Sequence, residues 1–456
     1  MKGFSTSAAI LAVCLMAAIA QGAEQKRTAP RNEPKKPAAD AAPVKAASAK
    51  ASDAKTGGAK ANTGKPGDAK PTSAETTKGS IQYLPLDAPE GMSQAVVVQG
   101  VALVHTRQLL PRDPQGRIVG PGQVGQQVEK VLDNLQTVLR ATGSSLNRLI
   151  RLNVYALAPG TIDLLRERLK ARLKPEVRPA ITTVLTPLPD PEALVAVDAV
   201  AAGADAGGEV ILKRVEAVAG GNDCADAAVL PRGGVVYLSG VPAEGGLTVS
   251  AVDQSMSTLM TLLQELKLSR TDLVQLKVFL RPAIAADDVR RAIKKYFPNQ
   301  PTPPLIFVEW LAPPPVEIEA IARLPETARK TDVAVEYYNP PYVRRLQIFS
   351  RVALVHTDRQ IYVSSLFARK PGRGQEQALD VFDQLETILE KAGSDLRHLA
   401  KATYYVCDDP SARGMDRARL WLYDQDRPPA ASKCMVHGVG KAKRTLTMDM
   451  IAVPGR

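Results

Sequence analysis

The sequence has 456 residues, of which 45% are hydrophobic and 23% charged, a composition typical of globular proteins. At roughly 100–200 residues per domain, this length predicts more than one domain. Aromatic residues make up 4% of the chain, too few for the base-stacking surface of a single-strand nucleic-acid binder. Neither an HExxH nor a CxxC motif occurs, so no metal site is predicted, and no cofactor is expected.

The net charge of +12 is concentrated near the N-terminus. Residues 24–80 hold 12 basic and 6 acidic side chains, whereas residues 81–456 hold 46 basic and 41 acidic ones, a net charge of +5. The excess of basic over acidic residues therefore lies largely in a tail, and nucleic-acid binding by the folded part is not expected.

The first 20 residues have the pattern of a secretory signal peptide. Lys2 precedes an apolar run over residues 8–20, and Ala18 and Ala20 form an A-x-A cleavage pattern. The alternative is a buried first helix. Residues 21–80 are rich in Ala, Lys and Pro and are expected to be a disordered basic linker. This linker is either a spacer or a tether to the anionic cell envelope, and the chain is expected to be secreted or periplasmic.

Three cysteines remain after the predicted cleavage, Cys224, Cys407 and Cys434. Cys407 and Cys434 lie on two predicted strands. They could form a disulfide, or they could be separate buried thiols.

An amphipathic helix is predicted over residues 124–143, because apolar residues recur at three- and four-residue steps. A strand follows at 148–156, then a helix at 161–173, a Pro-rich turn and a closing strand at 195–201. The same order recurs twice, and the second copy opens with a hairpin that includes VVYLSG (235–240). The later elements are helices at 256–268 and 378–393, strands at 272–280 and 398–406, helices at 285–297 and 411–424, and closing strands at 316–322 and 446–452.

The strands that follow the three long helices start at residues 148, 272 and 398, at offsets of 124 and 126. A nearly constant offset indicates internal repeats. The three repeats are predicted over residues 81–203, 212–325 and 333–454. Strands alternating with helices on one side of a sheet predict an α+β fold.

Several motifs resemble the RidA/YjgF family of imine and enamine deaminases, also described as endoribonuclease L-PSP-like. They are MSQAV (92–96), NLQTVLRATG (134–143), the turn at Pro179-Ala180, YLSG (237–240) and VEIEAIA (316–322). The resemblance implies a chorismate-mutase-like fold, a homotrimer with a barrel-like sheet core, and ligand clefts between subunits. Three copies in one chain, joined by short linkers, predict an intramolecular pseudo-trimer and hence a monomer.

The resemblance also implies one Arg in a P-x-R turn, which grips the carboxylate of a 2-imino acid through a bidentate fork. The matching positions hold Ile181, Leu305 and Ala431. None of these side chains can bind a carboxylate, so the clefts are predicted to have lost this contact.

Other candidate cleft residues follow from the same alignment of the repeats. The Ser-Gly pair of the opening hairpin is kept in the second repeat, and the first acid of the closing strand is kept only there, as Glu317. Glu317, Lys433 and Arg107 are the candidate catalytic residues, because the two cations could replace the lost Arg. Leu305 and Phe307 share a strand face, so together with Glu317 they are expected to line an apolar pocket with a single carboxylate. The complete set of candidate cleft residues is Thr106, Arg107, Ile181, Thr183, Ser239, Gly240, Leu305, Phe307, Glu317, Ser364, Ala431 and Lys433.

These residues support three functions. The first is binding of a small molecule, such as an imino or keto acid, with weak or no deaminase activity. The second is an active 2-imino acid deaminase, a hydrolase, that uses Lys433 or Arg107. The third is a ribonuclease, which the weakly charged folded region and the absence of a His pair disfavour.

Overall fold

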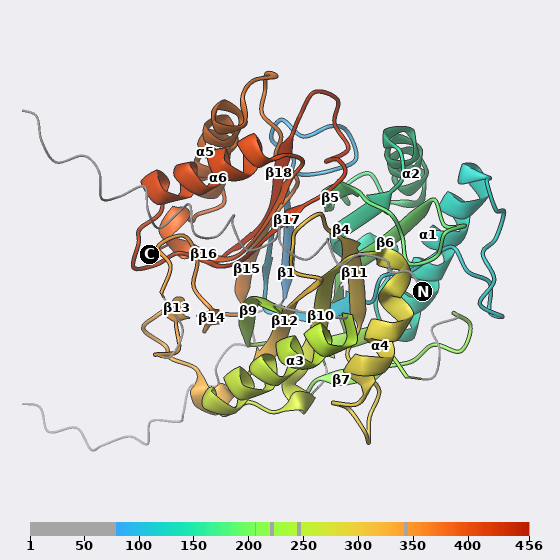
Figure 1. Cartoon of the computed structure of the whole chain (residues 1–456), viewed down its shortest axis with the longest axis horizontal. Coiled ribbons are helices and arrows are strands. Elements are labelled where there is room, and N and C mark those ends of the chain that lie inside the picture. The colour runs from blue at the N-terminus through green and yellow to red at the C-terminus, as the bar shows by residue number, and fades with distance from the viewer. Residues whose placement is uncertain (1–78, 206, 219–222, 244–247, 342–344, 456) are drawn as a thin grey trace, which may run out of the picture. The chain divides into compact units, whose positions relative to one another are not determined.

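The computed structural model describes residues 79–205, 207–218, 223–243, 248–341 and 345–455 (Figure 1). The predicted signal peptide and nearly all of the predicted linker lie outside these residues. The first repeat consists of β1 (Ser80–Leu84), β2 (Ala95–Gln99), β3 (Ala102–Thr106), α1 (Val124–Ala141), β4 (Leu149–Ala156), α2 (Pro159–Arg172), β5 (Ala180–Leu185) and β6 (Val195–Gly203).

The other two repeats have the same order of elements, and the predicted α+β class is confirmed. The second consists of β7 (Ile211–Lys213), β8 (Ala227–Leu230), β9 (Gly234–Ala243), α3 (Thr248–Glu265), β10 (Leu273–Leu280), α4 (Ala286–Lys294), β11 (Leu305–Glu309) and β12 (Val316–Leu324). The third consists of β13 (Val335–Tyr338), β14 (Val352–Val355), β15 (Arg359–Val363), α5 (Gly374–Lys391), β16 (Leu399–Val406), α6 (Asp409–Leu422), β17 (Ala430–Met435) and β18 (Leu446–Ala452).

Each of the three six-stranded sheets contains strands from two repeats. The strand orders are β1-β2-β15-β18-β16-β17, β5-β4-β6-β3-β8-β7 and β11-β10-β12-β9-β14-β13. Strand β2 pairs with β15 of the third repeat, although only Gly100 and Val101 separate it from β3. Strand β8 pairs with β3, and β14 pairs with β9. The first two strands of each repeat thus cover the edge of a neighbour's sheet, an edge that would otherwise offer unpaired backbone groups.

This arrangement corrects two expectations. The strand that contains VVYLSG does not form a hairpin with the strand before it, because β8 and β9 belong to different sheets. The strands also form three separate sheets, so the described residues contain no closed barrel. The cause of both differences is the exchange of strands between repeats.

The helices cover the outer faces of the sheets, and the inner faces pack together. In α1 the buried side chains include Val128, Val131, Leu135 and Val138, so the predicted apolar face is the buried one. A further apolar cluster joins residues of all three sheets. The central strands β4, β10 and β16 are consequently buried on both faces.

Cys407 and Cys434 are both free thiols, as is Cys224. The register of β16 and β17 places Cys434 opposite Tyr405 rather than opposite Cys407, so the two thiols do not form the disulfide that was considered. None of the described helices has the length and apolar character needed to cross a membrane.

Candidate functional site

The predicted cleft residues lie at three contacts, each between two repeats, and the three contacts have the same arrangement. The end of the third strand of one repeat lies beside the strand that follows the Pro turn of the next. Ser364 and Ser365, after β15, lie beside Ile181 and Thr183 on β5. The N–H of Ile181 donates to the Ser364 Oγ at 3.0 Å, and the N–H of Thr183 donates to the Ser365 Oγ at 3.1 Å.

A pocket of about 480 Å³ opens at this contact between the third and first repeats, named here the 3/1 pocket. Its volume lies within the range usual for small-molecule sites. Ile181, at 3% exposure, contributes to its lining. The apolar part of the lining is Ala88, Pro89, Met92, Pro159, Ile162, Ile181, Leu366, Phe367 and Ala442, and the polar and charged part is Asp87, Gln94, Asp163, Arg166, Thr183, Ser364, Ser365, Gln384 and Lys441.

The second contact joins the second repeat to the third. The N–H of Gly240 donates to the Ser432 Oγ at 3.1 Å, and the Ser239 Oγ donates to the carbonyl of Arg351 at 3.0 Å. The carboxylate of Glu317 packs directly on Gly240, where an added Cβ would lie 1.7 Å from the Glu317 Oε1. A side chain at position 240 would therefore displace the Glu317 carboxylate from this place.

Burial raises the pKa of Glu317 to about 7, and the nearby Glu319 carboxylate adds to the rise. A hydrogen bond with the Ser432 side chain and the charge of Arg351 oppose it. A carboxyl group with such a pKa can accept or donate a proton near neutrality.

Lys433 does not supply the missing cation of this second contact. Its Nζ donates to the Asp416 Oδ2 of α6 at 2.6 Å, and its side chain is 30% exposed. Ala431, two residues earlier on β17, is buried against the helices of the third repeat. Neither side chain offers a free cationic group to a ligand beside Glu317.

The third contact joins the first repeat to the second. The N–H of Gln108 donates to the carbonyl of Leu305 at 2.9 Å, and its side-chain amide donates to the carbonyl of Phe307 at 2.9 Å. Arg107 forms an ion pair with Asp226 at 2.6 Å, in which both side chains are nearly buried. The Thr106 Oγ1 accepts from the N–H of Ala199 at 2.9 Å.

These contacts correct the composition of one predicted cleft. Leu305, Phe307 and Glu317 all belong to the second repeat and were expected to line one pocket. The backbone carbonyl of Leu305 instead contacts the first repeat, whereas Glu317 lies beside Ser432 of the third. The reason is that β10 lies between β11 and β12, so the two strands take part in different contacts.

The second helix of each repeat carries a charged residue toward these contacts that the sequence reasoning missed. Arg166 of α2 lines the 3/1 pocket, and the guanidinium of Arg290 of α4 lies 5.7 Å from the centre of the Phe307 ring. Asp416 of α6 is the partner of Lys433. Aligning the second helices by their repeat offset places Arg166, Arg290 and Asp416 at one position, and this recurrence was the available signal.

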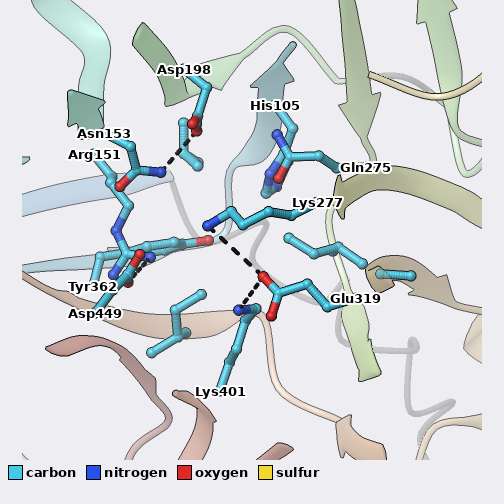
Figure 2. A pocket seen from close by; sticks show the side chains of 14 residues that line it. His105, Arg151, Asn153, Asp198, Gln275, Lys277, Glu319, Tyr362, Lys401 and Asp449 are labelled. Atoms are coloured by element: carbon cyan, nitrogen blue, oxygen red, sulfur yellow. Dashed lines mark hydrogen bonds and ion pairs between the residues drawn. The ribbon is translucent and has the colours of Figure 1, made fainter. Parts of the chain in front are cut away.

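The centre of the molecule holds a buried polar cluster, which was also missed (Figure 2). Each repeat supplies one acid from its closing strand and one cation from the strand after its long helix. The ion pairs are Arg151–Asp449 at 2.6 Å, Lys401–Glu319 at 2.8 Å and Lys277–Glu319 at 3.8 Å. Asp198 instead accepts from the Asn153 amide at 2.8 Å and the Tyr155 hydroxyl at 2.7 Å.

The cluster surrounds a cavity of about 30 Å³, which has room for about two water molecules. Among the residues that the structure describes, none is a hydrogen-bond partner of either ring nitrogen of His105, of the Glu319 Oε2 or of the Arg151 Nε. Burial, with the charge of Arg151, lowers the pKa of His105 to about 3, so this ring is neutral. The acid at the fourth position of VAVDAVA, VEIEAIA and LTMDMIA marks this cluster in the sequence, since it recurs in all three repeats.

Comparison with known proteins gives a family match for the first repeat. Residues 86–203 match the model of the family described as Endoribonuclease L-PSP. No curated protein matches the chain.

Solved structures that are similar each cover about one repeat. YyfB of Yersinia pestis, a protein of unknown function in the conserved Rid protein family, is 24% identical, with a TM-score of 0.24, and covers 27% of this chain and 98% of its own. NMB1025 of Neisseria meningitidis, a member of the YjgF family, is 20% identical, with a TM-score of 0.21, and covers 27% of this chain and 96% of its own. The yeast protein YEO7 has the same identity and TM-score and covers 27% and 99%. The family match is thus to the first repeat: residues 86–203 are similar to the Endoribonuclease L-PSP family, which supports a RidA/YjgF assignment of this repeat.

Proposed function

We propose that this protein binds a small organic molecule in the 3/1 pocket and has weak or no imine deaminase activity. The observation that carries the proposal is Ile181, which lines the pocket at the position where the family resemblance implies the carboxylate-binding Arg. The pocket has the size and the mixed lining of a ligand site. Its apolar wall offers contact area, while Ser364 and Ser365 hold the neighbouring backbone in place.

The position of the closing-strand acid supports the absence of hydrolysis in this pocket. The third repeat, which supplies Ser364 and Ser365, carries Thr447 at that position, and the Thr447 hydroxyl donates to the carbonyl of Leu366 at 2.8 Å. Glu317, the acid that is kept, belongs to the contact between the second and third repeats. Attack of water on an imine needs a proton acceptor close to the bound carbon, and Thr447 is not one.

The alternative, an active deaminase that uses Lys433 or Arg107, has less support. Both cations already form ion pairs, with Asp416 and Asp226 respectively. Binding a substrate carboxylate would require each cation to exchange a partner at 2.6 Å for the ligand.

We further propose that one chain takes the place of the family's homotrimer, as an exported monomer whose basic linker contacts the anionic cell envelope. The strand exchange supports the first part of this proposal, because every sheet is completed by strands of another repeat in the same chain. The signal-peptide pattern and the charge of residues 24–80 support the second part.

The deaminase test uses residues 21–456 and 2-iminobutyrate generated in situ. We expect no ammonia release above buffer. Release that is lost in Arg107→Ala or Lys433→Ala would overturn the binding-only proposal in favour of the alternative. Release that survives in both variants would overturn it as well, and would point to another group.

The binding test uses hexan-1-ol as an apolar probe, followed by ligand-observed NMR. Met92→Trp replaces an unbranched thioether of the 3/1 pocket lining with a larger indole ring and should abolish binding. Leu420→Trp on the exposed face of α6, at 40% exposure, is the matched control and should bind normally. Binding unchanged in Met92→Trp would exclude this pocket as the ligand site.

A further inference from the structure

Two cations line the 3/1 pocket, one from each of its two repeats. Arg166 comes from α2 of the first repeat, and Lys441 from the segment between β17 and β18 of the third. Neither occupies the position of the expected Arg, which is taken by Ile181 on β5.

Lys441 has no carboxylate within 4.0 Å among the residues that the structure describes. Its Nζ lies 5.3 Å from the centre of the Phe367 ring, which also lines the pocket, and Lys441 is exposed. Partial burial and the charges of Arg444 and Arg166 lower the pKa of Lys441. None of the described carboxylates therefore forms an ion pair with this positive charge.

Arg166 is weakly paired in comparison with the other cations of the three contacts. Its carboxylate partner is Asp163, at 3.9 Å, and the Asp163 side chain is 77% exposed. Asp87 also lines the mouth and is exposed. A water-exposed carboxylate at this distance contributes little, so Arg166 can bind a ligand without losing a strong ion pair.

The equivalent positions in the other two repeats are engaged differently. The guanidinium of Arg290 covers the Phe307 ring, and Asp416 is an acid that binds Lys433. The 3/1 pocket therefore combines a cavity, an apolar wall and a cation available from the second helix.

We propose that the ligand of the 3/1 pocket is an amphipathic monocarboxylate whose carboxylate lies between Arg166 and Lys441. Its apolar chain then extends along Ile181, Met92 and Leu366. This inference rests on the proposed function and adds the class of ligand and its orientation. The carboxylate lies at the mouth of the pocket, whereas the family resemblance would place it at Ile181.

The test compares hexanoate with hexan-1-ol, which share the apolar chain and differ in charge. Binding is measured by ligand-observed NMR on residues 21–456 at pH 7 and low salt. We expect hexanoate to bind about 10-fold more tightly than hexan-1-ol, because two charge-assisted contacts at a partly exposed site each contribute modestly. Lys441→Gln and Arg166→Gln should each lower hexanoate affinity about 3-fold and leave hexan-1-ol affinity unchanged.

The matched control is Lys443→Gln, on the same segment but outside the pocket lining. It should leave both affinities unchanged. Equal affinity of the wild-type chain for the two probes would overturn the carboxylate assignment and leave the binding pocket standing. If neither probe binds, the pocket is not a ligand site and both proposals are wrong. If Lys443→Gln loses as much hexanoate affinity as Lys441→Gln, the effect comes from general surface charge. The assignment of the carboxylate to Lys441 would then be wrong.

Discussion

The Nζ of Lys401 donates to the Glu319 Oε1 at 2.8 Å, which joins β16 of the third repeat to β12 of the second (Figure 2). Both side chains are buried, and Lys277 approaches the same carboxylate oxygen at 3.8 Å. One carboxylate thus neutralises two buried cations from two repeats. Burial lowers the pKa of Lys401, which is the direction expected where the charged form is poorly solvated.

Replacing Glu319 with Gln should destabilise the chain strongly, because two buried ammonium groups lose their carboxylate. Removing one member of a buried ion pair typically costs about 3–5 kcal/mol. Chemical denaturation at pH 7 measures the effect. The control is Lys330→Met, which removes the exposed pair with Glu336 and should cost less than about 1 kcal/mol. Equal stabilities of the two variants would contradict the role assigned to Glu319.

Glu317 should make stability depend on pH near neutrality. Its pKa is about 7 in the folded chain and 4.5 as the unperturbed value, so the folded state holds the proton more tightly. The contribution of Glu317 to the free energy of unfolding is fully present below pH 4.5 and is lost as the pH rises through 7. The loss is about 3 kcal/mol, because each tenfold difference in proton affinity between the folded and unfolded chains corresponds to about 1.4 kcal/mol.

The measurement is the unfolding free energy of the wild-type chain and of Glu317→Gln at pH 5 and pH 8. The wild-type chain should lose stability relative to the variant on going to pH 8. A constant difference between the two proteins would show that Glu317 ionises normally.

His105 should give the opposite dependence at lower pH. Its pKa is about 3 in the folded chain and 6.5 as the unperturbed value, so the unfolded chain takes up the proton first. Stability from this group is present above pH 6.5 and is lost as the pH falls toward 3. Between pH 7.5 and 4.5, the wild-type chain should lose about 3 kcal/mol relative to His105→Gln. Denaturation curves at these two pH values measure the loss, and parallel changes in both proteins would contradict it.

The order of elements could be predicted from the sequence, but the contacts between repeats could not. The apolar spacing in α1 fixes a helix and its buried face, and that pattern needs no knowledge of the other repeats. The pairing of β2 with β15 is a contact between repeats, which the apolar pattern of a strand does not specify. Leu305 and Glu317 were assigned to one pocket because the sequence does not show that β10 lies between their two strands.

The partners of the charged side chains in the site also could not be predicted from the sequence. The alignment of the repeats found Arg107 and Lys433, yet both form ion pairs whose partners come from elements that a strand alignment does not include. Arg166 escaped notice because it lies on a helix, where a cation is usually a solvated surface residue. Its place in the 3/1 pocket follows from the packing of α2, which is a tertiary property.

The exchange of strands between repeats can be tested by cross-linking β2 to β15. Gln99 and Arg359 are register partners on these antiparallel strands, and both are partly exposed. Their Cα atoms should lie about 4.5–5.5 Å apart, which is within disulfide range. The variant with both residues changed to Cys should therefore form a disulfide on mild oxidation. This bond would close a loop of more than 250 residues and should increase the mobility of the unfolded chain on a non-reducing gel.

Gln99→Cys alone is the control and should not shift. A band at the mass of two or more chains would mean that the strands pair between chains, and the monomeric pseudo-trimer would then be wrong. No cross-link of either kind would contradict the pairing of β2 with β15.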